Sequence, residues 1–344
     1  MRKYLNIRRA HSIIDKFPRA RVLVIGDLIM DHFIWGKVKR ISPEAPVPVV
    51  EVTSENLMLG GSANVVNNIH SLNGGALVTG IIGRDSDGAK LVQALKAKGI
   101  PADGIVTDAS RPTTIKTRIV AHSQQLVRFD REKRDKIGAQ TFEKVVAYIK
   151  KAVRSADIVV ISDYAKGLIT ETLVQETSEL CSKYGKPIAV DPKVEHFDYY
   201  KGVTIVTPNN LEASQASGIE ISDGPSLHRA GEFLYNKLGC KALLVTRGEH
   251  GMSLFEPDSV TNIPTVAKEV YDVSGAGDTV IGVLALSLAA GASFKEAAVL
   301  ANFAAGVVVG KIGTATLTRD ELTEAVGEGL KAWPRNGKKR KKDA

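Results

Sequence analysis

Short apolar segments rich in β-branched residues alternate along most of this chain with segments of helical periodicity. The first covers residues 21–26, where four consecutive apolar side chains are typical of a strand buried on both faces. Continuous apolar strands separated by helices predict an α/β fold with a doubly wound, mostly parallel sheet flanked by helices. We expect strands at 21–26, 76–82, 158–162, 187–191, 203–207 and 242–246, and helices at 63–72, 87–98, 139–153, 172–184, 227–238 and 280–290.

Polar residues follow several of these strands. In an open sheet of this kind, ligands bind beyond the carboxyl ends of the strands. We therefore expect a binding site along this edge of the sheet. Its candidate residues are Asp27, Asp31, Asp163, Asp191, Lys193, Asn209, Thr246, Arg247 and Gly248.

Two segments break the alternation. Residues 41–50 hold three prolines at short spacing, which is too many for a central strand, and residues 113–130 alternate in polarity. We expect small β-ribbons near 33–52 and 113–130, outside the main sheet. Such ribbons could cover an active site as a lid or pair with a second copy in a homodimer.

The composition is typical of a soluble enzyme. The 344 residues are 44% hydrophobic and 24% charged, enough to bury a large core, and no apolar stretch reaches the ~18–20 residues that would span a bilayer. Residues 1–21 are charged and lack a signal-peptide core, so we expect a cytoplasmic protein with no membrane insertion. Cys181 and Cys240 form no CxxC motif and are expected to be buried thiols. The seven histidines have no zinc-ligand spacing.

The net charge of +8 is concentrated at the C-terminus. Residues 335–344 carry six Lys or Arg and one Asp, so the remaining chain has a charge of only about +3. Such a run is typical of a disordered tail, and no aromatic residues interleave the cations, so no nucleic-acid partner is expected. We expect a helical extension at 1–20, one main domain at 21–330 and a basic, disordered tail at 331–344.

A glycine-rich turn at residues 272–278 leads directly into the apolar helix expected at 280–290. A helix beginning here would direct unpaired N–H groups and its positive dipole end at one point, which suits a phosphate-like anion. A carboxylate such as Asp278 is unfavourable beside a phosphate unless it takes a proton from the group that attacks that phosphate. A glycine-rich loop closed by Asp is more often structural, so this interpretation depends on its context.

The common nucleotide-binding motifs are missing from the chain. It has no GxxxxGK[ST] sequence, no GxGxxG after the first strand and none of the protein-kinase motifs. A nucleotide would therefore have to bind near the turn at 272–278.

Three ordered motifs then point to one family. Residues 59–64, followed by Gly80 and Gly83, resemble the first motif of the ribokinase-like (PfkB) carbohydrate kinases. Residues 272–278 resemble their second motif, and 209–212 resemble their NxxE element. This resemblance covers roughly residues 20–320 and implies a ribokinase-like fold with ATP-dependent sugar kinase activity.

The resemblance also implies roles for individual residues. Asp278 would be the catalytic base, with Gly275, Ala276 and Gly277 forming an anion hole for the transferred phosphoryl group. Asn209 and Glu212 would organise Mg²⁺ through water, in agreement with its ligand preference. Carbonyl groups near Asp272, Ser274 and Gly313 could hold a monovalent cation, which the sequence leaves open. The expected nucleotide-binding residues are Asn209, Asn210, Leu211, Glu212, Thr246, Arg247, Gly248 and Gly251.

Further segments resemble one branch, the D-glycero-β-D-manno-heptose 7-phosphate kinases, which often form the N-terminal half of a bifunctional heptose kinase/adenylyltransferase. The branch implies phosphorylation of the C1 hydroxyl to give the 1,7-bisphosphate for ADP-heptose and lipopolysaccharide core synthesis. The chain ends soon after the kinase-like region, so we expect a stand-alone kinase. Ala165 departs from the branch, where relatives often carry Gly. The matching segments are 26–31, 40–50, 124–130, 162–167 and 190–193.

A sugar phosphate needs carboxylates and amides for its hydroxyls and cations for its phosphate. Each candidate cation could instead be a solvated surface charge. Two alternatives remain open, a kinase of this family for another sugar or sugar phosphate, and a catalytically silent sugar- or nucleotide-binding dimer. The resemblance implies that Asp31, Gly60, Gly61, Asn64 and Asp163 bind the sugar, and the cations expected at the 7-phosphate are Arg118, Arg128, Lys166 and Lys193.

Overall fold

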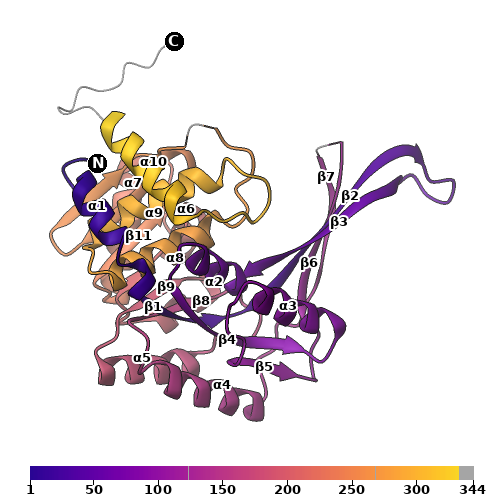
Figure 1. Cartoon of the computed structure of the whole chain (residues 1–344), viewed down its shortest axis with the longest axis horizontal. Helices are drawn as coiled ribbons and strands as arrows, with labels where there is room; N and C mark the ends of the chain where they lie inside the picture. The colour runs from indigo at the N-terminus through magenta and orange to yellow at the C-terminus, as the bar shows by residue number, and fades with distance from the viewer. Residues whose placement is uncertain (123, 268, 333–344) are drawn as a thin grey trace.

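A nine-stranded sheet lies at the centre of the molecule (Figure 1). The computed structural model describes residues 1–122, 124–267 and 269–332. The strand order is β13-β12-β11-β10-β9-β8-β1-β4-β5, and only the pairings β11–β12 and β12–β13 are antiparallel. The strands are β1 (Arg21–Gly26), β4 (Gly75–Gly83), β5 (Ile105–Asp108), β8 (Ile158–Ser162), β9 (Ile188–Asp191), β10 (Ile205–Val206), β11 (Ala242–Thr246), β12 (Met252–Glu256) and β13 (Ser259–Ile263).

Helices cover both faces of this sheet. In β1, Val22 and Val24 belong to one hydrophobic core and Leu23 and Ile25 to the other, because successive side chains of a strand point to opposite faces. The first core contains side chains of α1 (Ile7–Ile14), α2 (Ser62–Ser71), α3 (Ser86–Ala97), α8 (Ala276–Ala289), α9 (Phe294–Val308) and α10 (Arg319–Ala332). The second contains side chains of α4 (Ala139–Ala152), α5 (Glu171–Tyr184), α6 (Asn210–Ser217) and α7 (Gly224–Leu238).

Helix α8 is apolar on all sides. Every residue from 278 to 287 in this helix is buried, which is expected of a helix enclosed by protein rather than one facing solvent. It packs mainly on α9 and α2. The buried body of the helix therefore fixes the position of its N-terminus, which carries the glycine-rich turn.

A second sheet of four strands lies outside the main one and extends away from it (Figure 1). Its order is β3-β2-β6-β7, with β2 parallel to β6 and the other pairs antiparallel. Pro48 is the first residue of β3, an edge strand, where a missing N–H is tolerated. We refer to β2 (Leu28–Ile41), β3 (Pro48–Gly61), β6 (Thr114–Ala121) and β7 (Gln124–Arg131) as the small sheet.

Several elements differ from those expected. The strand expected at 203–207 has only two residues, Ile205 and Val206, and Pro208 has no N–H with which to continue it beyond Thr207. The antiparallel hairpin β12–β13 and the helices α9 and α10 were not predicted. Residues 331 and 332, assigned to the basic tail, are the end of α10, whereas 333–344 lie outside the described residues.

The compositional expectations concern cysteines and membrane spans. Cys181 and Cys240 are free and buried, and burial raises the pKa of the two thiols to about 12 and about 11 respectively. In the described part of the chain, no helix is both long and apolar enough to cross a membrane.

Candidate active site

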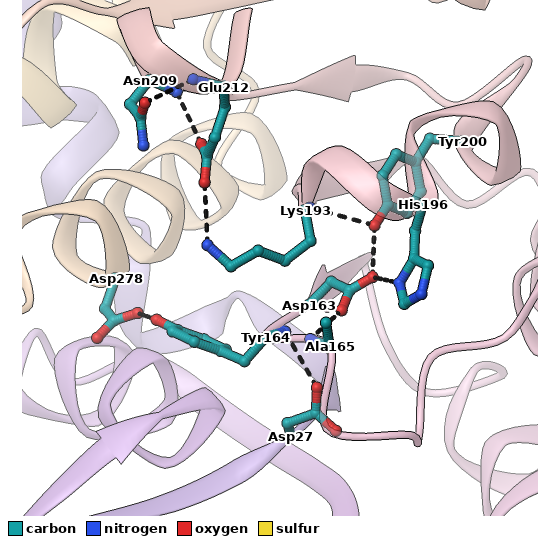
Figure 2. A network of polar contacts seen from close by, with 10 residues as sticks. All are labelled: Asp27, Asp163, Tyr164, Ala165, Lys193, His196, Tyr200, Asn209, Glu212 and Asp278. Atoms are coloured by element: carbon teal, nitrogen blue, oxygen red, sulfur yellow. Dashed lines mark hydrogen bonds and ion pairs between the residues drawn. The ribbon is translucent and has the colours of Figure 1, made fainter. Parts of the chain in front are cut away.

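Helix α8 packs on β1, β8 and β9, and polar residues lie at the carboxyl ends of these strands and of β11. Asp27 and Asp163 directly follow β1 and β8, and Asp191 and Thr246 are the last residues of β9 and β11. Figure 2 shows several of these residues converging with Asp278 from α8. The site therefore lies at the edge where a doubly wound sheet binds its ligands.

Asp278 lies in the first turn of α8 and is only 4% exposed. The side-chain amide of Asn64 donates a hydrogen bond of 2.7 Å to its Oδ2, and the hydroxyl of Tyr164 donates to its Oδ1. Burial raises the pKa of Asp278 to about 6, while these two hydrogen bonds act in the opposite direction. Such a carboxylate is ionised at neutral pH and can accept a proton there.

The turn before α8 depends on a left-handed glycine. Gly275 has a φ of 77°, and a Cβ at this position would approach Asn64 Nδ2 to 2.6 Å. The Ala276 N–H donates to the Val273 carbonyl at 3.2 Å, whereas the N–H groups of Gly275 and Gly277 have no protein acceptor within the described residues. Two of the three residues expected to form an anion hole thus offer unpaired amides, and Ala276 uses its own within the turn.

A hydrogen-bond network joins the first motif to this helix. Asn68 Nδ2 donates to the Asn64 carbonyl at 3.0 Å, and Thr279 Oγ1 donates to Asn68 Oδ1 at 2.9 Å. These groups are buried, so their hydrogen bonds are costly to break. Helices α2 and α8 therefore hold Asn64 and Asp278 in a fixed relation.

The expected monovalent-cation residues also come together. Asp272 accepts hydrogen bonds of 2.9 Å from the N–H groups of Ser274 and Gly313. The cation itself stays a prediction.

The NxxE element forms a reciprocal capping box at the start of α6. Asn209 Oδ1 accepts from the Glu212 N–H at 2.9 Å, and Glu212 Oε2 accepts from the Asn209 N–H at 3.0 Å. The other carboxylate oxygen, Oε1, lies 3.0 Å from Lys193 Nζ (Figure 2). Lys193, expected at the substrate phosphate, is thus placed beside the NxxE element. Asn210 begins α6, and Leu211 is 65% exposed.

The remaining nucleotide candidates form a turn beside Asn209. Thr246 ends β11 and pairs with Asn209 through an isolated β-bridge. The Arg247 N–H donates to the Gly251 carbonyl at 2.8 Å. A Cβ on Gly251 would approach the Ile263 carbonyl oxygen to 2.1 Å, whereas a Cβ on Gly248 would meet open space. Gly251 is therefore required by packing, whereas Gly248 is favoured by its left-handed φ of 54°.

The small sheet contributes a second group of predicted residues. Arg118 Nη1 lies 2.5 Å from Asp31 Oδ1. A Cβ on Gly60 would approach Asp31 Oδ2 to 2.1 Å, so this position excludes larger residues. Gly61, with a φ of 55°, turns the chain from β3 into α2, the helix that carries Asn64.

The cations of this region form a cluster that includes one unpredicted lysine. Lys116 lies two residues before Arg118 on β6, hence on the same face, and burial together with Lys166, Arg128 and Arg118 lowers its pKa. Its alternation with Arg118 in the sequence was the signal that could have identified it. Arg128 pairs with Asp130 through two hydrogen bonds of 2.9 and 2.6 Å, and Lys166 Nζ lies 2.6 Å from Glu132. Three of the four predicted cations thus act on the pKa of Lys116 and form a cationic cluster with it, and Lys193 is not among them.

Asp163 lies within an internal network instead of facing open space. Its Oδ1 accepts from the Ala165 N–H at 2.7 Å, and its Oδ2 accepts from the Tyr200 hydroxyl at 2.5 Å and lies 2.6 Å from His196 Nδ1 (Figure 2). Asp163 is only 1% exposed. Both of its oxygens have protein partners, so its expected contact with a sugar hydroxyl has no direct support in this geometry.

Magnesium can be tested against the charges near the NxxE element. Burial, and then the neighbouring carboxylates of Glu212 and Asp278, raise the pKa of Asp191 well above its ordinary value. A hard divalent cation would relieve this repulsion. No group of three or more metal-binding side chains occurs within the described residues. Magnesium held through water near Asn209 and Glu212 stays a prediction.

The comparisons with known proteins identify the class to which this fold belongs, the carbohydrate kinases. The profile of the pfkB family carbohydrate kinase matches residues 19–321, and the chain belongs to this family.

Two curated relatives of high similarity carry the same name. The chain is 48% identical over 321 residues to the "Bifunctional protein HldE" of Geobacter sulfurreducens. The matched segment covers 93% of this chain and 66% of the relative. It is 46% identical over 314 residues to the protein of that name from Desulfatibacillum aliphaticivorans, covering 91% and 64%. The chain thus spans less than two thirds of the length of these relatives.

Solved structures show the same fold at low sequence identity. Arabidopsis thaliana ribokinase complexed with ribose and ATP has a TM-score of 0.71 at 20% identity, covering 89% of this chain and 98% of that one. Escherichia coli phosphofructokinase-2 in complex with potassium has a TM-score of 0.76 at 20% identity, covering 91% and 99%.

Proposed function

We propose that this carbohydrate kinase transfers the γ-phosphoryl group of ATP to the C1 hydroxyl of D-glycero-β-D-manno-heptose 7-phosphate. The observation that carries a phosphoryl transfer is the buried carboxylate of Asp278 at the N-terminus of α8, beside the amides of Gly275 and Gly277, which have no acceptor in the described part of the chain. The choice of heptose is supported by the branch-specific sequence segments and by the relatives named HldE. The product would be the 1,7-bisphosphate, a precursor of the ADP-heptose used for lipopolysaccharide core.

The proposed reaction assigns a role to each of these groups. Asp278 accepts the proton of the C1 hydroxyl while the oxygen of that hydroxyl forms a bond to the γ-phosphorus. The bond from this phosphorus to the β-phosphate oxygen breaks, which releases ADP. The amides of Gly275 and Gly277 and the dipole of α8 stabilise the negative charge on the transferred group. Mg²⁺, when bound, supplies further neutralisation of the phosphate charge.

The two sides of Asp278 receive different ligands in this proposal. The nucleotide phosphates lie on the side of Asn209, Glu212 and Lys193, so we move Lys193 from the sugar phosphate to the nucleotide. The sugar lies against Asp31 and Asn64. The 7-phosphate is held by the cluster of Lys116, Arg118, Arg128 and Lys166.

In this proposal Asp163 acts indirectly, by holding the loop that carries Lys166. Its hydrogen bond to the Ala165 N–H holds the loop that follows β8, and this loop carries Lys166 into the cationic cluster. Asp163 is therefore proposed as a positioning residue.

A panel of sugars and sugar phosphates, assayed for ATP consumption with Mg²⁺ present, tests the substrate. We expect the highest kcat/KM with heptose 7-phosphate, and a much lower value with unphosphorylated heptose, because losing charge-assisted hydrogen bonds costs about 1.5–3 kcal/mol each. Equal values for the two heptoses would return the assignment to a kinase of this family for another sugar. Binding of sugar and nucleotide without any turnover would favour the catalytically silent dimer.

A further inference from the structure

Tyr164 lies between the two halves of the candidate site. Its hydroxyl donates to Asp278 Oδ1 (Figure 2). Two lysines approach its ring, with Lys116 Nζ 5.0 Å and Lys193 Nζ 5.7 Å from the ring centroid. Lys116 belongs to the cationic cluster of the small sheet, and Lys193 is paired with Glu212 of the NxxE element. The phenol ring thus contacts the sugar side, the nucleotide side and the base at once.

The loop that carries Tyr164 is held at its backbone by two buried carboxylates. Asp27 Oδ2 accepts from the N–H groups of Tyr164 and Lys166 at 3.0 and 3.1 Å. Asp163 accepts from the N–H of Ala165, which adopts a left-handed φ of 52° that is unfavourable for a residue with a Cβ. A strained conformation persists only where its surroundings enforce it, and it is often found at functional sites.

We propose that Tyr164 is a positioning residue whose hydroxyl orients the Asp278 carboxylate for proton abstraction. This inference rests on the proposed function of Asp278 as the base. Together, Asn64 from α2 and Tyr164 from the loop after β8 hold one carboxylate oxygen each, so the carboxylate cannot rotate freely. Each carboxylate oxygen retains a second lone pair, which can accept a hydrogen bond from the sugar hydroxyl.

The charges around Asp278 show why this donor matters. Burial is the main effect that opposes its ionisation. The carboxylates of Asp31 from β2 and Asp191 from β9 add to this opposition, and Lys116 from β6 favours ionisation. Burial and the nearby Asp278 carboxylate raise the pKa of Tyr164 well above its ordinary value, so its hydroxyl remains a donor throughout the working range.

Tyr164→Phe removes the hydroxyl and keeps the ring between the lysines. We expect kcat to fall about tenfold or more with little change in the KM for ATP, and the acidic limb of the kcat/KM pH profile to move up by about one pH unit. Difluorotyrosine at position 164 keeps the shape of the side chain and makes its hydroxyl a stronger donor, so it should move the acidic limb to lower pH. This second variant keeps the test valid if the Phe variant does not fold.

Tyr200→Phe is the matched control. It also removes a phenol that donates to a buried carboxylate, but that carboxylate is Asp163. It should leave the acidic limb at the wild-type position. An unchanged limb and kcat in Tyr164→Phe would overturn the proposal. A higher kcat with a lower sugar KM would also overturn it, because Tyr164 would then occupy the place of the acceptor hydroxyl.

A measurement without substrate separates this proposal from the proposed function. Urea unfolding of Tyr164→Phe, Asp278→Asn and the double variant gives the coupling between the two side chains. We expect a coupling of about tenfold in the unfolding equilibrium constant at pH 8, and a smaller one at pH 4, where Asp278 is protonated. An absent coupling overturns the pairing even if the enzyme is active. A clear coupling in a protein that phosphorylates no sugar would reject the proposed function and retain the pairing.

Discussion

The carboxylate of Asp278 is subject to opposing effects that decide its chemistry. Burial disfavours its charge, and the donors Asn64 and Tyr164 favour it. The result is a folded-state pKa of about 6, above the ~4 of an aspartate in an unfolded chain. A folded protein with such a group binds a proton more tightly than the unfolded chain does.

This shift predicts a pH-dependent stability. Tighter proton binding by Asp278 in the folded state adds up to about 3 kcal/mol to the free energy of unfolding. This contribution is fully present below pH ~4 and is lost as the pH rises through about 6. In Asp278→Asn, urea unfolding should therefore show a weaker decline in stability from pH 4 to pH 7 than in the wild type. Asp27, whose pKa burial also raises to about 6, should behave alike in Asp27→Asn. Parallel pH profiles for all three proteins would contradict this explanation.

Single residues of the site differed in how far sequence could identify them. Asp278 and Asn64 lie in recognisable motifs, and the structure brings their side chains into contact. Tyr164 was not proposed as a site residue, because nothing in its spacing shows that a side chain 114 positions from Asp278 will touch it. Lys193 follows a strand end, and a strand end alone does not reveal which side of the site its long side chain will reach.

At the scale of elements, the most accurate predictions were those with strong local signals. The strands β1, β8 and β11 have the predicted boundaries, because each is a short apolar run with polar or glycine neighbours. Helix α9 was missed because most of its residues are buried, so it shows little amphipathic periodicity. The hairpin β12–β13 was not predicted, because the alternation of strands and helices along the chain predicts parallel strands, and these two strands are antiparallel. Tertiary packing decides such segments.

Separate elements also carry the two halves of the site. The small sheet carries Arg118, and the segment that follows β9 carries Lys193. We predict that Lys193→Met raises the KM for ATP or lowers kcat while the sugar KM changes little. Arg118→Met should instead raise the sugar-phosphate KM about tenfold or more, because it loses a charge-assisted contact. The measurement is a two-substrate kinetic matrix for each variant.

The kinetic comparison has a clear contrary result. If Lys193→Met raises only the sugar KM, Lys193 contacts the substrate phosphate as its sequence position first suggested. If neither variant changes either constant, both cations serve only their internal partners, Glu212 and Asp31.

At the scale of the whole molecule, the small sheet projects from the main body (Figure 1). Several of its apolar side chains are exposed. Leu57, Val127 and Phe129 are 44, 47 and 53% exposed. They lie on the face opposite Asp31, because strand side chains alternate and Leu57 pairs with His32. We propose that this face packs against a second copy of the chain.

Phe129→Glu should convert that dimer into a monomer, since a charge in an apolar interface must be desolvated without a partner. Sedimentation velocity of the full chain measures this directly. Phe233→Glu on α7 changes an aromatic residue of similar exposure, 48%, and should leave the dimer intact. A wild-type monomer, or a dimer that survives Phe129→Glu, would contradict the proposed interface.

The most direct test of the whole account is the phosphoryl-transfer rate of Asp278→Asn at saturating ATP and sugar phosphate, with ATP binding measured by calorimetry. Asn keeps the shape of the side chain and cannot accept the proton, so turnover should fall ~10²–10⁴-fold while the Kd for ATP stays within a few-fold. Asp198→Asn, which removes an exposed carboxylate paired with Lys237 at 3.0 Å, should retain wild-type turnover. Turnover of Asp278→Asn within tenfold of the wild type would show that Asp278 is not the base and would contradict the proposed mechanism.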